Sequence, residues 1–134
     1  MPKIIAIQTR NNSDSLLDFV SELNEKHKNE ANNYSKPLLN AIALFEEFGP
    51  MINYYYQKKS SFYKNLNSIY QGLGEIRTNK CRYFIFDTKD EGIWIGLHGY
   101  EKQSQDIPRN EIIKAKGEIQ LWKENYLKTS PRQA

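Results

Sequence analysis

Four side chains that can do chemistry near neutral pH lie in the second half of the chain: Arg77, His98, Tyr100 and Lys102. Arginine binds phosphate oxygens through its planar fork, and lysine can stabilise a developing anion. Histidine exchanges protons near neutral pH, and tyrosine can stack on a base or donate a hydrogen bond. Together such groups could remove a proton, stabilise charge at phosphorus and protonate a leaving group, as RNA cleavage by an internal 2′-hydroxyl requires.

The segments that carry these side chains have the composition of β-strands. Residues 81–86 and 93–101 are rich in aromatic and β-branched residues and are separated by a polar tip ending in glycine, which predicts a hairpin. Alternation along the second strand places His98, Tyr100 and Lys102 on one face, which we expect to be open. The aliphatic residues of this strand should pack under the helices on the other face, and they are Ile93, Ile95 and Leu97.

A preceding strand over residues 72–77 should bring Arg77 to the same open face. Ile76 belongs inside, so Glu75 and Arg77 belong outside. Arg82, on the first hairpin strand, permits two interpretations because two phenylalanines share its side of the strand. Either Arg82 lies near the sheet edge, or those rings line the open face.

Several candidates also have a purely structural interpretation. A single histidine in a strand, such as His98, is more often a hydrogen-bonded structural residue than a catalytic one. Surface arginines and lysines are usually only solvated, and Cys81 is interpreted as a small core residue. The chain has two histidines and one cysteine, so we expect no zinc site, and we expect no cofactor.

A second candidate region combines three consecutive tyrosines at residues 54–56 with Lys58 and Lys59. Rings beside cations can bind RNA by stacking on bases and attracting phosphates. The alternative is a linking segment whose rings cover the sheet edge. Apolar residues at helical spacing over residues 62–69 favour a short helical turn after it.

The composition indicates one ordinary globular domain. The chain has 134 residues, of which 39% are hydrophobic and 26% charged, which is enough for one core. No apolar run is long enough for a membrane span or a secretory signal, so we expect no membrane association. One cysteine cannot form an internal disulfide, which fits the cytoplasm, and a net charge of +3 permits a nucleic-acid partner without requiring one.

The remaining segments predict the elements that support the strands. Residues 3–8 predict a first strand. Helical spacing of apolar residues predicts three helices, over residues 15–27, 37–48 and 108–128. A polar run before the first helix offers N-caps, Ser35 and Pro37 begin the second, and Gly49 ends it.

This order of elements, β-α-α-β-β-β-α, predicts an α+β fold. We expect a mostly antiparallel four-stranded sheet with the helices packed on one face. Residues 1–128 should form a single domain, and residues 129–134 a C-terminal tail.

Over these strands and the last helix the sequence resembles the HigB-like (phage Gp49-like) branch of the RelE-type toxins. The family typically shows a Gly-Leu-x-Glu-Leu-Arg strand, an Arg-aromatic strand and a Leu-His-Gly-Phe-x-Lys-Lys-x-Gln-x-x-Pro-x-x-Glu-Ile run. The matching stretches follow in that order, at residues 72–77, 82–86 and 97–112. The resemblance is specific over residues 66–126 and looser over residues 3–48. Two positions differ: Gly74 stands where the family usually has an aromatic residue, and Gln103 replaces a second lysine.

The resemblance implies a RelE-like fold and the toxin of a type II toxin–antitoxin pair, a ribosome-dependent mRNA endonuclease that acts without metal. Arg77 and Arg82 would bind the scissile phosphate. Lys102 matches the family's first lysine, and His98 and Tyr100 match its histidine and aromatic positions. The further candidates for RNA binding are Lys58, Lys59, Lys64, Lys80 and Gln105.

The resemblance also implies partners: a HigA-like helix-turn-helix antitoxin, the ribosome and mRNA, with operator DNA contacted only through the antitoxin. Replacing Arg77 or Arg82 with alanine should then abolish toxicity and leave the fold intact. Two other interpretations stay open, a non-catalytic RNA- or protein-binding module on the same fold and a purely structural phage protein. The missing lysine at Gln103 motivates the first of these.

Overall fold

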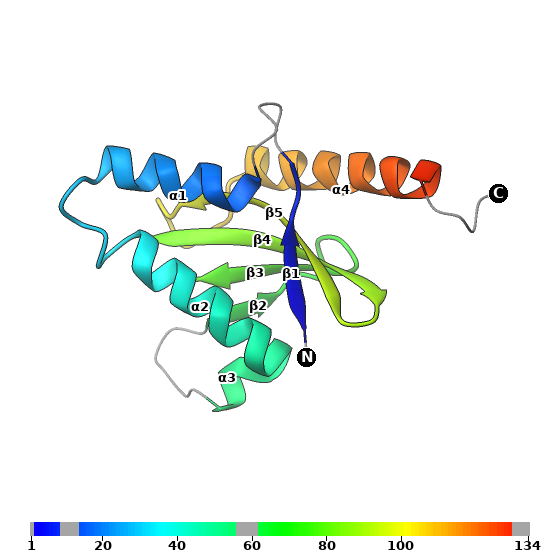
Figure 1. Ribbon diagram of the computed structural model, residues 1–134, viewed down its shortest axis with the longest axis horizontal. Helices are drawn as coiled ribbons and strands as arrows, with labels where there is room; N and C mark the ends of the chain where they lie inside the picture. Colours follow the sequence, from blue (N-terminus) through cyan, green and yellow to red (C-terminus); the bar gives the residue numbers. More distant parts are fainter. Residues whose placement is uncertain (1, 9–13, 56–61, 130–134) are drawn as a thin grey trace.

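A five-stranded sheet lies at the centre of the computed structural model, which describes residues 2–8, 14–55 and 62–129. The strands stand in the order β1-β5-β4-β3-β2 (Figure 1). β1 runs parallel to β5, and the other neighbouring pairs are antiparallel. The strands are β1 (Lys3–Ala6), β2 (Tyr63–Asn65), β3 (Leu73–Arg77), β4 (Cys81–Asp90) and β5 (Ile93–Glu101). The predicted α+β class is confirmed, with one strand, β2, more than the four expected.

The helices form where the apolar spacing predicted them, and they are α1 (Ser15–Lys26), α2 (Ser35–Phe48) and α4 (Arg109–Thr129). A 3-10 turn (Gly49–Met51) and the short α3 (Ile52–Tyr55) follow α2. Asp14 caps α1, because its Oδ1 accepts the N–H of Leu17 at 2.7 Å. Ser35 is not a cap: it opens α2, and its Oγ donates to Oδ1 of Asn24 at 2.7 Å. Gly49, with φ of 65°, ends α2 as predicted.

Helices cover both faces of the sheet, so the prediction of helices on one face is wrong. One core contains α1 and α2 side chains with Ile76, Tyr83 and Ile85 from the strands. The other contains Ala115 and Ile119 of α4 with further strand residues. All six residues from Cys81 to Phe86 are buried, and a strand that is apolar on both faces needs cover on both. Figure 1 shows α2 lying across the strands and α4 running alongside the sheet.

A β-bulge in β5 overturns the predicted alternation of its side chains. Tyr83 pairs with Gly99 and Ile85 with Gly96, so Leu97 and His98 together stand opposite one residue of β4. The extra residue shifts the alternation. Leu97 and Tyr100 therefore join the same core on the α4 face, where opposite faces were expected.

Strand β2 takes residues 63–65 of the segment where a helical turn was expected, and the turn itself begins at Leu66, whose carbonyl accepts the N–H groups of Ile69 and Tyr70 at 2.9 and 3.1 Å. Asn53 of α3 holds β2, since Oδ1 accepts the N–H groups of Phe62 and Tyr63 at 2.9 and 3.2 Å. The ring of Tyr63 then lies over Gly74, where an added Cβ would come within 2.6 Å of it. An aromatic side chain from β2 thus occupies the space beside the position where the resembling family has its aromatic residue.

The β4–β5 hairpin is longer than expected. β4 continues to Asp90, so most of the polar tip expected over residues 87–92 is strand. The turn residues are Glu91 and Gly92, with φ of 50° and 74°. Positive φ at both central residues is the geometry of a two-residue hairpin turn.

Candidate functional site

Strand pairing brings three of the predicted site residues into one row on the α4 face. Arg77 of β3 pairs with Arg82 of β4, and Arg82 pairs with Tyr100 of β5. Directly paired residues of antiparallel strands project to the same face. Arg82 therefore lies on the face of Arg77 together with Phe84. Neither of its two interpretations holds, because β4 is the central strand and Phe84 and Phe86 are buried in the core with α4.

Glu75 lies at the centre of this row and was not among the predicted site residues. Its side chain is 1% exposed, and its Oε2 accepts the hydroxyl of Tyr100 at 2.9 Å. Its Oε1 lies 3.4 Å from Nε of Arg77 and 3.6 Å from Nε of Arg82. Neither Oε1 of Glu75 nor Nε of Arg77 makes a well-aligned hydrogen bond, so the ion pairs are electrostatic contacts of imperfect geometry.

The signal that could have identified Glu75 was present in the sequence. Its spacing from Arg77 already placed both on one face. What strand periodicity does not indicate is that α4 and β5 bury this part of the face.

Burial controls the protonation of the cluster. Burial raises the pKa of Glu75, although the Tyr100 hydrogen bond and the two arginines act against it. Burial and the nearby Glu75 carboxylate raise the pKa of Tyr100, so its phenol stays protonated at neutral pH. Burial and the charge of Arg77 lower the pKa of Arg82. Three desolvated polar groups therefore share one point, which is typical of functional sites.

The two arginines differ in exposure. Arg82 is 8% exposed, and its Nη1 donates to the carbonyls of Thr78 and Cys81, the latter at 2.9 Å. Arg77 is 22% exposed, so it is the arginine that reaches solvent. The expectation that alanine leaves the fold intact therefore applies to Arg77. At Arg82 alanine would remove the buried guanidinium that donates to the carbonyls of Thr78 and Cys81, although the Cys81 carbonyl keeps the N–H of Thr78.

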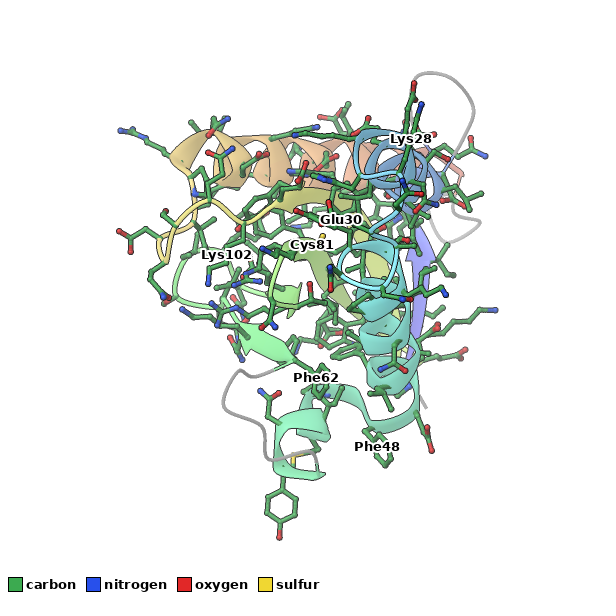
Figure 2. The ribbon with its side chains drawn as sticks, turned by 90° about the vertical axis from the view of Figure 1, so that its left-hand side faces the viewer. Lys28, Glu30, Phe48, Phe62, Cys81 and Lys102 are labelled. Atoms are coloured by element: carbon green, nitrogen blue, oxygen red, sulfur yellow. The ribbon has the colours of Figure 1, made fainter. Side chains whose placement is uncertain are left out.

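Of the remaining predicted contacts, Lys64, Lys80 and Lys102 adjoin this row. Lys64 pairs in register with Glu75, which puts its exposed side chain on the same face. Lys102 follows β5, and its N–H donates to the carbonyl of Lys80 at 2.8 Å. Figure 2 shows Lys102 on the side of the sheet away from α2. Lys80 and Gln105 are exposed.

The tyrosine-lysine region is only partly described. Tyr54 is exposed, whereas Tyr56, Lys58 and Lys59 lie outside the described residues. The choice between an RNA-contacting patch and a linking segment there stays a prediction.

His98 is held between two carboxylates of α4 and does not lie on an open face. Its Nδ1 lies 2.5 Å from Oε1 of Glu118, and its Nε2 lies 3.0 Å from Oε1 of Glu111. The imidazole is 8% exposed and packs against the ring of Phe84. This geometry matches the structural interpretation of His98, as a tie between the sheet and α4. Glu111 and Glu118 complete the tie, and no sequence pattern paired them with His98.

A reactive thiol or a metal ion would provide other chemistry. Cys81 is fully buried, as predicted, and burial raises the pKa of its thiol to about 11. Within residues 2–8, 14–55 and 62–129, no group of three His, Cys, Asp or Glu side chains is placed to hold a metal ion. No helix in that part of the chain is both long and apolar enough to cross a bilayer.

The mostly antiparallel sheet and its helices define the class of protein as α+β, and this architecture is consistent with a RelE-like fold. A family model for phage-derived Gp49-like proteins matches residues 18–120, so the chain belongs to this family of RelE/HigB-like toxins. No curated protein matches the chain. Family membership makes the protein a toxin-like one, and a toxin of this kind generally has an antitoxin as partner.

Proposed function

We propose that this protein is the toxin of a type II toxin–antitoxin system and cleaves mRNA on the ribosome, which inhibits translation. The observation that carries the proposal is the row of Arg77, Arg82 and Tyr100 around the buried carboxylate of Glu75. Two guanidinium groups near one carboxylate leave an excess of one positive charge, which the charge of a phosphodiester would balance.

The proposed reaction is attack of the ribose 2′-oxygen on the adjacent phosphorus, with no metal taking part. The bond to the 5′-oxygen breaks, leaving a 2′,3′-cyclic phosphate and a 5′-hydroxyl end. The proton lost by the 2′-hydroxyl is matched by one delivered to the leaving oxygen. The barrier is lowered chiefly by cations aimed at the phosphoryl oxygens, where negative charge develops.

In this proposal Arg77 and Lys102 contact the phosphate, because both reach solvent. Arg82 supports them from the buried side. Tyr100 aligns the base or ribose with its ring edge, because its hydroxyl donates a hydrogen bond to Glu75. His98 acts as a positioning residue through α4, and it could reach RNA only if Glu111 and Glu118 released it.

The partners follow from the same proposal. A HigA-like helix-turn-helix antitoxin would inhibit the toxin and bind operator DNA on behalf of the pair. The toxin itself would act in the cytoplasm on ribosome-bound mRNA, with Lys64, Lys80 and Gln105 as additional RNA contacts around the rim.

A second candidate function is a binding module on the same fold that contacts RNA or protein without cleaving it. Gln103 in place of a lysine and the burial of Arg82 and Tyr100 favour it.

Induced expression with mapping of transcript 5′ ends tests the proposal. A nuclease toxin should arrest growth, produce discrete new ends inside coding regions, and be relieved by co-expression of the neighbouring gene. Growth arrest without new 5′ ends would favour the binding module.

A further inference from the structure

A polar hollow lies at the α1–α2 turn, outside the proposed reaction centre. Its volume is about 470 Å³, and a smaller hollow of about 140 Å³ shares Asn32 with it. Lys28 and Lys36 line the first, and Asn79 and Lys80 line the second. Five asparagines contribute to the two hollows, and among the described residues that line them none is acidic.

We propose that the two hollows form a binding track for the backbone of single-stranded RNA, continuous with the candidate site. This inference rests on the proposed function, because it extends the path of the same substrate. The track would run from Lys102 across the β3–β4 turn to the α1–α2 turn.

The β3–β4 turn connects the two regions. The N–H of Lys102 donates to the carbonyl of Lys80 at 2.8 Å, and Lys80 lines the smaller hollow. The same turn presents the carbonyls of Thr78 and Cys81 to the guanidinium of Arg82. One short turn therefore borders both the arginine row and the hollow. Figure 2 looks onto this end of the molecule, with Lys102 on one side and Lys28 on the other.

The chemistry of the lining fits a phosphodiester chain. Spaced lysines attract successive phosphates and release counterions, while asparagine amides can donate to phosphate or ribose oxygens without adding repulsion. An acidic protein segment would also meet cations, but protein interfaces bury an apolar centre. Ala31 and Pro37 are the apolar side chains among the described lining residues, so we favour RNA.

Two carboxylates lie near the track: Glu101 pairs with Lys26, and Glu30 faces His27. Glu101 lies 2.9 Å from Nζ of Lys26 and 2.6 Å from Nε2 of His27. Glu30 lies 3.7 Å from Nδ1 of His27, whose ring stacks on Tyr34 with centroids 3.7 Å apart. The ammonium of Lys26 therefore partly offsets the repulsion of a phosphate by Glu101.

Fluorescence anisotropy with an unstructured single-stranded RNA of about twelve nucleotides, a length within the usual span of single-strand sites, tests the track. The test variant is Lys28→Gln with Lys36→Gln. The matched control is Lys114→Gln with Lys116→Gln, which removes the same charge from exposed positions of α4. We expect about tenfold weaker binding by the test variant, and a salt dependence whose slope falls by about 1.4, the value for two phosphate contacts of a single strand. The control should keep the wild-type affinity and slope within twofold.

Equal weakening of both variants would overturn the track, since net charge alone would explain it, and so would absence of RNA binding by the wild type. Tighter binding of an acidic peptide than of RNA, lost with Lys28 and Lys36, would assign the hollows to a protein instead. Cleavage is scored separately. Track-dependent binding without cleavage contradicts the proposed function alone, and cleavage with unchanged KM in the test variant contradicts the track alone.

Discussion

The hydroxyl of Tyr100 lies 2.9 Å from Oε2 of Glu75 and donates its hydrogen bond into the sheet. The phenol is therefore directed away from any RNA that meets the rim of the site. Its pKa is raised by burial and by the Glu75 carboxylate, which keeps the proton on the oxygen. In the proposed function, Tyr100 therefore offers RNA its ring and not its hydroxyl, which Glu75 holds.

Replacing Tyr100 with phenylalanine should lower stability more than activity. The change leaves a buried carboxylate oxygen without its donor, which costs roughly 1–3 kcal/mol. Urea unfolding measures the loss, and cleavage by the folded variant should stay within a few-fold of wild type. Loss of cleavage with unchanged stability would instead make the hydroxyl a participant in the chemistry.

Replacing Glu75 with glutamine should preserve stability at neutral pH while impairing activity. The pKa of Glu75 is raised by burial, so folding favours its protonated form relative to the unfolded chain. Its contribution to stability is then fully present below its ordinary value of 4.5 and is lost as pH rises through the folded value. Glutamine keeps the acceptor for Tyr100 and should flatten this part of the pH profile in urea unfolding. A large loss of stability at pH 7 in the variant would show that the ion pairs outweigh desolvation.

Replacing Glu118 with glutamine should weaken the attachment of α4 to the sheet. Glu118→Gln weakens the contact of His98 with the helix, at a cost of about 1–3 kcal/mol for a charged hydrogen bond in a buried setting. Hydrogen exchange should accelerate in α4 relative to α2. Glu124→Gln makes the same change at an exposed position of α4 and serves as control. Equal exchange rates of α4 in the two variants would show that the contact between His98 and Glu118 does not hold the helix.

Stability should fall at alkaline pH because a buried tyrosine must ionise. Burial and then Asp87 raise the pKa of Tyr63 from 10.0 to about 12. A raised tyrosine pKa gives stability that is present below the unfolded value of 10.0 and lost as pH approaches 12. Tm measured across this range should drop less steeply in Tyr63→Phe. An unchanged slope in that variant would contradict the buried placement of the hydroxyl.

Much of the fold follows from local sequence signals. The apolar spacing of α1, α2 and α4, the cap at Asp14 and the stop at Gly49 are local features, and the structure confirms them. Strand β2 is three residues long and is held by the side chain of Asn53, a contact between separate elements. Apolar spacing alone favoured a helical turn over residues 62–69, and the turn forms only from Leu66 onward.

The candidate site could be predicted only in part from the sequence, and for a different reason. Alternation placed Arg77 and Glu75 together, which pairing confirms. The bulge at Leu97 and His98 then shifts the alternation of side chains in the rest of β5. Strand periodicity in the sequence gives no sign of a bulge. The cover by α4 depends on contacts between residues 98 and 118, which no local pattern encodes.

The rate of mRNA cleavage on programmed ribosomes by Arg77→Ala, compared with wild type and with Lys114→Ala, tests the role of the arginine row most directly. Arg77 is the partly exposed member of the arginine row, and Lys114 is an exposed cation of α4 outside the row. We predict that Arg77→Ala cleaves at a rate lower by roughly 10²–10³, the usual effect of removing one group that stabilises developing charge, and unfolds at the wild-type midpoint. Cleavage at the wild-type rate by folded Arg77→Ala would contradict this prediction.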